Sequence, residues 1–86
     1  MARYKITIKK SAAKELEEIP AKDLRKIVKR IQSLAQNPRP QGSQKLSTKE
    51  QYRTRQGDYR IVYSIDDKAL VVDIVKVGHR REVYRL

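Results

Sequence analysis

Hydrophobic and polar residues alternate strictly near the start of the chain. In residues 3–9, RYKITIK, the apolar side chains of Tyr4, Ile6 and Ile8 take every second position, and polar residues fill the others. A period of two predicts a strand with one buried face.

The hydrophobic period then lengthens to that of a helix. Ala12, Leu16 and Ile19 stand at spacing i, i+4, i+7 and predict a short amphipathic helix, with Ser11 as its N-cap. Pro20 closes this helix or opens the next one, because proline is tolerated only in the first turn of a helix.

Residues 21–36 carry the clearest helical pattern in the chain. Their apolar stripe consists of Leu24, Ile27, Val28, Ile31, Leu34 and Ala35. Asn37-Pro38 is expected to end this helix, since the residue before a proline is disfavoured in the α region. Two helices with almost no linker predict a helix hairpin lying across a sheet. The polar segment 38–47 is predicted to be a loop.

From residue 51 the period returns to two. Residues 51–56 and 59–65 predict two antiparallel strands joined by a tight turn at Gly57-Asp58. Residues 69–77 predict a third, more apolar strand. The order β-α-α-β-β-β predicts a single α+β domain over residues 1–86, with an antiparallel sheet covered on one face by the helix hairpin.

Three arginines occupy alternate positions of the predicted strand pair. Tyr59 is expected to face the helices, so Arg60 points to the open face of the sheet. Arg53 and Arg55 share that open face if Tyr52 joins the core. Guanidinium groups in such a row can bind phosphates with two hydrogen bonds each and can stack on bases.

The alternative is that the arginines only keep an exposed sheet face polar. Two features favour phosphate binding. No acidic residue opposes the arginines in this register, and His79-Arg80-Arg81 and Tyr84 are expected beside the same face. A basic surface with an aromatic residue at its rim is typical of proteins that bind single-stranded RNA. Tyr84 alternatively packs on the sheet edge, and His79 alternatively is a polar turn residue.

The net charge strengthens the case for a polyanionic partner. The chain has 21 Lys+Arg against 10 Asp+Glu, a formal net charge of +11. Nucleic acid is the first candidate and an acidic protein the second; a membrane surface is weaker, because the lysines do not gather opposite one apolar helix face. Solubility alone is the remaining explanation, although mixed charges achieve it with less excess.

Composition also excludes several kinds of chemistry. The absence of cysteine excludes disulfides, thiolate catalysis and cysteine-ligated zinc, and a single histidine cannot build a multi-histidine metal centre. We therefore expect no metal and no cofactor. Without a long apolar run, we expect a cytoplasmic protein that does not bind membranes.

Two motifs resemble a known family. The pattern YRxRxGDYRIVY over residues 52–63 and VxVGHRRxVY over residues 75–84 resemble the RelE/ParE superfamily of toxins, and RelE-like members in particular. The resemblance covers nearly the whole chain, including the order of its strands and helices.

This resemblance implies a toxin of a type II toxin–antitoxin system that acts as a ribosome-dependent mRNA endonuclease. Such toxins cut the codon in the ribosomal A site. The ribose 2′-OH attacks the adjacent phosphate and leaves a 2′,3′-cyclic phosphate and a 5′-OH. The implied partners are the ribosome with its mRNA and a cognate acidic antitoxin, in a heterotetramer or a related complex. Operator DNA would be reached only through the antitoxin.

Position by position, the resemblance also implies roles for individual residues. Arg53 and Arg55 match two basic positions that are lysine in the best-known member. Arg60 matches the arginine that would stabilise the phosphorane, and Arg80 the one that would assist the leaving 5′-oxygen. Tyr84 matches a tyrosine that stacks on or orients the substrate base.

The identity of the general base stays open at this point. Arginine is a poor base because it stays protonated. His79 is the alternative, since histidine exchanges protons near neutral pH, and catalysis by the ribosome and electrostatics alone is a third option. Arg81 and Arg85 are expected to add RNA contacts.

Two other functions remain open for the same fold. A ParE-like poison of DNA gyrase is the main rival, because arginine replaces lysine at Arg53 and Arg55. An inactive module that binds an antitoxin or a nucleic acid is the other.

Overall fold

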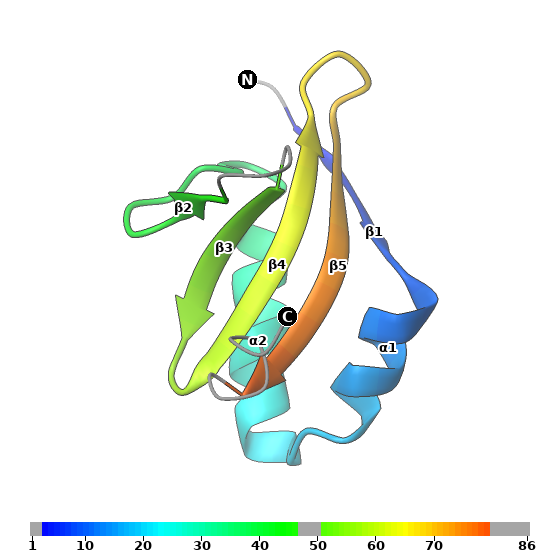
Figure 1. Ribbon diagram of the computed structural model, residues 1–86, viewed down its shortest axis with the longest axis vertical. Coiled ribbons are helices and arrows are strands. Elements are labelled where there is room, and N and C mark those ends of the chain that lie inside the picture. Colours follow the sequence, from blue (N-terminus) through cyan, green and yellow to red (C-terminus); the bar gives the residue numbers. More distant parts are fainter. Residues whose placement is uncertain (1–2, 47–50, 80–86) are drawn as a thin grey trace.

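The structure, a computed structural model, describes residues 3–46 and 51–79 (Figure 1). Its elements in chain order are β1 (Lys5–Ile8), α1 (Lys10–Glu17), α2 (Ala21–Ser33), β2 (Gln44–Lys45), β3 (Gln51–Gln56), β4 (Tyr59–Asp66) and β5 (Val71–His79). This confirms the predicted α+β class and adds one short strand to the predicted order.

The strands form one sheet in the order β1-β5-β4-β3-β2. Three of the four neighbouring pairs are antiparallel, while β1 runs parallel to β5, with Lys5 opposite Val71 and Ile8 opposite Ile74. The first strand of the chain therefore lies beside the last described one.

The segment 38–47 is not a loop throughout, and that prediction was wrong. Gln44 and Lys45 form β2 and pair antiparallel with Arg53 and Tyr52 of β3. A strand of two residues is too short to show an alternating pattern, so no hydrophobic periodicity predicts it.

The helix boundaries differ slightly from those expected. Ser11 lies inside α1, which begins at Lys10, and its N-cap position is Lys9, without a side-chain cap; the expected cap at Ser11 was wrong. Helix α2 ends at Ser33 rather than at residue 36. Neither helix in the described residues is long and apolar enough to cross a membrane.

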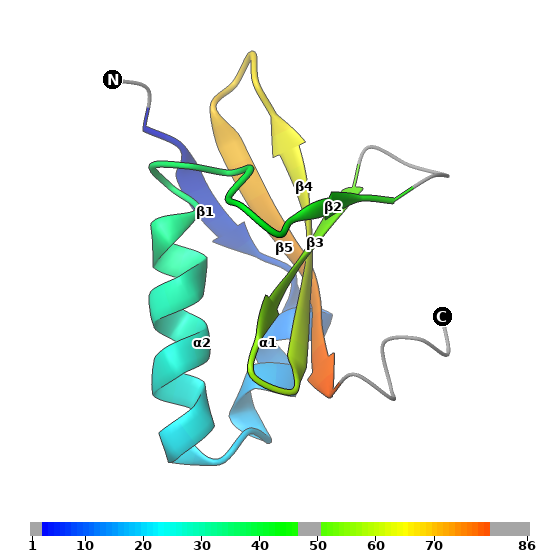
Figure 2. The ribbon, with the colours of Figure 1, turned by 90° about the vertical axis from the view of Figure 1, so that its left-hand side faces the viewer.

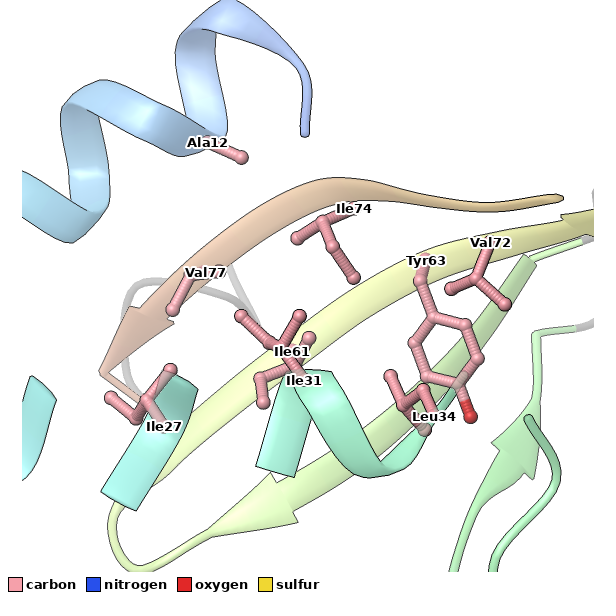
Figure 3. Close-up of a cluster of buried hydrophobic side chains, with 9 residues drawn as sticks. All are labelled: Ala12, Ile27, Ile31, Leu34, Ile61, Tyr63, Val72, Ile74 and Val77. Carbon is pink, nitrogen blue, oxygen red and sulfur yellow. The ribbon is translucent and has the colours of Figure 1, made fainter. Parts of the chain in front are cut away.

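Helix α2 covers one face of the sheet, and α1 packs beside the end of β5 (Figures 1 and 2). The buried cluster consists of Ala12, Ile27, Ile31, Leu34, Ile61, Tyr63, Val72, Ile74 and Val77. In Figure 3 the α2 side chains of this cluster point toward those of β4 and β5. Burial raises the pKa of Tyr63 to about 12, and its hydroxyl donates to the Pro38 carbonyl oxygen at 2.7 Å.

Beyond the end of β1, the side chain of Glu15 hydrogen-bonds to the edge of β5. The Glu15 carboxylate on α1 accepts from the Val77 backbone N–H at 3.1 Å and from Lys76 Nζ at 2.6 Å. It therefore satisfies a backbone donor that β1 no longer reaches.

A polar network ties the opposite end of the sheet together. Arg39 donates to both oxygens of Asp67 at 3.2 and 2.9 Å and to the Tyr52 hydroxyl at 3.2 Å, while the Tyr4 hydroxyl donates to Asp67 at 2.7 Å. These hydrogen bonds, the one from Arg39 first, lower the pKa of Asp67. The network joins the β4–β5 turn to Tyr4 just before β1, to β3 and to the segment after α2.

Candidate nucleic-acid interface

The β3–β4 hairpin directs its arginines away from the helices. Thr54 is only 3% exposed, and the Tyr52 ring stacks on that of Tyr63 in the core, with centroids 6.0 Å apart. Because neighbouring strand residues point to opposite faces, Arg53 and Arg55 lie on the open face. Their predicted side of the sheet is confirmed.

The strand register brings the arginines together. Arg55 is paired with Arg60 across β3 and β4, and Arg53 is paired with Val62 in the next row. On the other side of Arg60 lies Gly78 of β5. We call Arg53, Arg55 and Arg60 the arginine face.

No acidic residue is registered opposite any member of the arginine face among the described strands. Side chains directly opposite each other have Cβ atoms about 4.5–5.5 Å apart, and like charges in that position are destabilising. The pairing of Arg55 with Arg60 therefore places two positive side chains next to each other on the open face.

The three guanidinium groups differ in their exposure. Arg55 is exposed and makes no hydrogen bond or ion pair within the described residues. Arg53 is half-buried and donates from Nη2 to Gln44 Oε1 at 2.5 Å. Arg60 is 3% exposed, with Nη1 3.4 Å from the Tyr59 carbonyl oxygen.

The burial of Arg60 corrects the expectation that all three arginines stand open to solvent. Its registered neighbour on β5 is Gly78, which has no side chain. Gly78 is not among the residues with positive φ, so the backbone at this position does not require glycine.

An acidic residue does lie further along the same face. Asp73 is paired with Ser64 and Thr7 in the sheet. Its carboxylate binds Lys9 Nζ at 3.0 Å and accepts from the Thr7 hydroxyl at 2.8 Å. Asp73 is therefore engaged at the β1 side of the sheet, away from the arginine hairpin.

His79 does not lie beside the arginine face, and that expectation was wrong. Strand β5 continues through Gly78, so the next residue points to the opposite side of the sheet. His79 is registered with Tyr59, and their rings meet edge to face with centroids 5.8 Å apart. Tyr59 packs against the core from the helix side.

Two hollows flank the Tyr59–His79 pair. One, of about 300 Å³, is also lined by Asp23 and Lys26 of α2. The other, of about 180 Å³, is also lined by Glu15. His79 thus shares its surroundings with side chains of the helix layer.

The remaining residues of the predicted site, Arg80, Arg81, Tyr84 and Arg85, lie outside the described residues. Within the described ranges, no group of three or more His, Asp or Glu side chains is placed to hold a metal ion. Sequence reasoning missed Gln44, which lay in a segment read as a loop, and the position of Gly78 next to Arg60.

Comparisons with known proteins agree on one family. The sequence profile described as the ParE toxin of the type II toxin–antitoxin system parDE matches residues 6–84. A Mycobacterium tuberculosis protein named Toxin RelE is 33% identical over 85 residues, which cover 96% of this chain and 88% of that protein.

Solved structures show the same fold. The toxin–antitoxin complex RelBE2 from Mycobacterium tuberculosis contains a chain with a TM-score of 0.81 and 27% identity, covering 91% of this chain and 99% of that one. A chain of the archaeal RelE–RelB complex from Pyrococcus horikoshii has a TM-score of 0.81 and 31% identity, covering 93% and 97%. The chain belongs to the RelE/ParE superfamily and is a toxin of a type II toxin–antitoxin system.

Proposed function

We propose that this toxin is a ribosome-dependent mRNA endonuclease that cleaves the codon in the A site. The observation that carries the proposal is the pairing of Arg55 with Arg60, with no acidic residue registered opposite either one in the described strands. The similarity to proteins named RelE supports the same reaction class.

The arginine face suits cleavage of a phosphodiester by its own ribose. The 2′-oxygen forms a bond to the adjacent phosphorus, the bond from phosphorus to the 5′-oxygen breaks, and the proton of the 2′-OH is transferred to solvent or a ribosomal group. The 5′-oxygen gains a proton as it leaves. Charge accumulates on the phosphoryl oxygens during this step, and preorganised guanidinium groups stabilise that charge.

Burial makes Arg60 the natural centre of this site. A buried guanidinium interacts with a phosphoryl oxygen more strongly than an exposed one, because the local dielectric is lower. We assign Arg60 to the transition-state charge and Arg53 and Arg55 to binding the flanking phosphate.

Residues outside the arginine face have different parts in the proposal. His79 is given no contact with the reacting phosphate, because it lies on the helix side of the sheet. Arg80, as a donor to the leaving 5′-oxygen, and Tyr84, as the residue that orients the base, stay predictions from the family pattern. Arg81 and Arg85 stay predicted RNA contacts.

The partners follow from the charge. We propose a cognate antitoxin with an acidic segment that folds over the basic surface, as expected for a partner of a chain with net charge +11. Complexes with a RelB antitoxin among the solved relatives support this partner class. We propose that operator DNA is contacted only by the antitoxin.

Brief induction in cells with mapping of mRNA 5′ ends tests the proposed activity. We expect cuts within translated codons that disappear in Arg60→Gln and Arg80→Ala. A plasmid supercoiling assay is run beside it, because the family profile is named for ParE. Growth arrest with intact mRNA and trapped gyrase–DNA complexes would contradict the proposal and favour gyrase poisoning.

A further inference from the structure

The short strand β2 lies against the outer edge of β3 at the position of Arg53. Gln44 of β2 is registered with Arg53, and the Leu46 backbone N–H donates to the Gln51 carbonyl oxygen at 2.8 Å. Side chains of residues registered opposite each other project to the same face of the sheet. Gln44 therefore shares the open face with Arg53.

The two side chains are in direct contact. Arg53 Nη2 donates to Gln44 Oε1 at 2.5 Å. The registered neighbour of Arg53 on its other side is Val62, which is 4% exposed and has no side-chain acceptor. Of these two neighbours, only Gln44 can hold the guanidinium through its side chain.

The chemistry of this acceptor differs from that around another arginine of the chain. Arg39 donates to both carboxylate oxygens of Asp67, so its charge is compensated. Gln44 offers a neutral amide oxygen, which fixes the guanidinium in one direction and leaves its positive charge uncompensated by the glutamine. An arginine side chain has many rotamers, and such a contact restricts them before the substrate binds.

We propose that Gln44 is a positioning residue that directs Arg53 toward the substrate phosphate without neutralising it. The inference rests on the proposed endonuclease function and names the element, β2, that orders one of its arginines. Gln44 acts through Arg53 and does not touch the reacting atoms.

The test uses Gln44→Leu, which removes the acceptor, and Gln44→Glu, which keeps an acceptor but adds a negative charge. Gln51→Leu is the matched control, because Gln51 is a glutamine on the same face of the same hairpin whose side chain makes no hydrogen bond in the described residues. Cleavage of programmed ribosomes is measured under single-turnover conditions, across toxin concentration and across salt.

We expect Gln44→Leu to slow cleavage about fivefold, the equivalent of one hydrogen bond, and to leave the salt dependence of ribosome binding unchanged. Gln44→Glu should lower the slope of log affinity against log salt by about one, as the loss of one phosphate contact does. In the Arg53→Ala background, Gln44→Leu should have no further effect.

Two results separate the inference from the proposed function. If Arg53→Ala slows cleavage while Gln44→Leu behaves like Gln51→Leu, the positioning role is wrong and the endonuclease stands. An additive effect of Gln44→Leu on Arg53→Ala would also overturn it, because the glutamine would then act independently of the arginine. A wild-type toxin that cuts no mRNA on ribosomes would overturn both proposals together.

Discussion

Arg55 on β3 lies directly opposite Arg60 on β4, and within the described part of the sheet neither has an acidic residue registered against it. The two residues differ sharply in burial, since Arg55 is exposed and Arg60 is 3% exposed. A pair of like charges in a sheet lowers stability. The proposed function assigns Arg60 to the transition-state charge and Arg55 to the flanking phosphate.

Replacing Arg55 should therefore raise the stability of the fold and lower the rate of cleavage. We expect Arg55→Gln to raise the free energy of unfolding by up to about 0.5 kcal/mol, because the repulsion with Arg60 is removed. The same change should slow cleavage at low toxin concentration about tenfold or more, because a charged hydrogen bond to the flanking phosphate is lost. Urea unfolding and single-turnover cleavage measure the two effects.

Arg25→Gln on the exposed side of α2 is the charge-matched control for this variant. It should leave the cleavage step within about twofold of wild type, since it lies on the helix layer. Equal losses in the two variants would show that total charge, and not the arginine face, drives cleavage.

Gly78 provides a steric test of the same face. Its backbone does not have positive φ, so Gly78→Ala should keep the fold, but the added methyl group would project beside Arg60. We expect cleavage to fall about tenfold or more, because small displacements of catalytic groups have large effects. Gly57→Ala is the contrast, because Gly57 has a φ of +60°, and its main effect should be on stability.

Much of this fold could be predicted from alternation alone. The faces of β3 and β4 followed from Tyr52 and Tyr59, and both tyrosines pack against the core as expected. The period of two fixes each side chain relative to its strand neighbours, so the arginines could be assigned to one face before the structure was known.

Other features depend on where a strand ends and on which strand lies beside it. A local hydrophobic pattern predicts neither of these. His79 was misplaced because β5 runs on to residue 79, so His79 takes the same helix-side face as the buried Val77, two positions before it. The contact between Gln44 and Arg53 could be predicted only if the existence of β2 were already known. Likewise, the position of Gly78 beside Arg60 is set by the pairing of β4 with β5, which no local pattern shows.

Glu15 should stabilise the fold because it accepts hydrogen bonds at the edge of β5. Its carboxylate bonds the Val77 N–H and Lys76 Nζ, and the Glu15 and Lys76 side chains are 27% and 24% exposed. We expect Glu15→Ala to lower the free energy of unfolding by about 1–3 kcal/mol, because a backbone donor and a cation lose their acceptor. Thermal and urea unfolding measure this change.

The exposed Glu17 on the same helix makes no hydrogen bond or ion pair in the described residues, and Glu17→Ala is the control. It should change stability by less than about 0.5 kcal/mol. If the two variants unfolded alike, the carboxylate of Glu15 would have no role at the sheet edge.

The Asp67 network makes part of the stability dependent on pH. Arg39 and Tyr4 lower the pKa of Asp67 in the folded protein, so the stabilisation is complete above the unfolded value of about 3.9. It is lost as the pH falls through the folded pKa. Asp67→Asn should therefore be less stable than wild type at pH 7, and the difference should shrink on acidification below pH 4.

Denaturant unfolding at a series of pH values measures this difference. Asp58→Asn in the β3–β4 turn is the control, because Asp58 makes no hydrogen bond or ion pair within the described residues. A gap between wild type and Asp67→Asn that stayed constant from pH 7 to below pH 3 would contradict the role given to the ionised carboxylate.

In the proposed reaction, the arginine face stabilises attack of the ribose 2′-OH on its own phosphate. The most direct test of this step is cleavage of ribosome-bound mRNA in which one nucleotide of the A-site codon carries 2′-hydrogen in place of 2′-OH. We predict that wild-type toxin cuts the all-ribose message to a 2′,3′-cyclic phosphate and a 5′-OH, and that the substituted bond stays intact. Cleavage of the 2′-deoxy bond at the same rate, or products with a 5′-phosphate, would contradict the account.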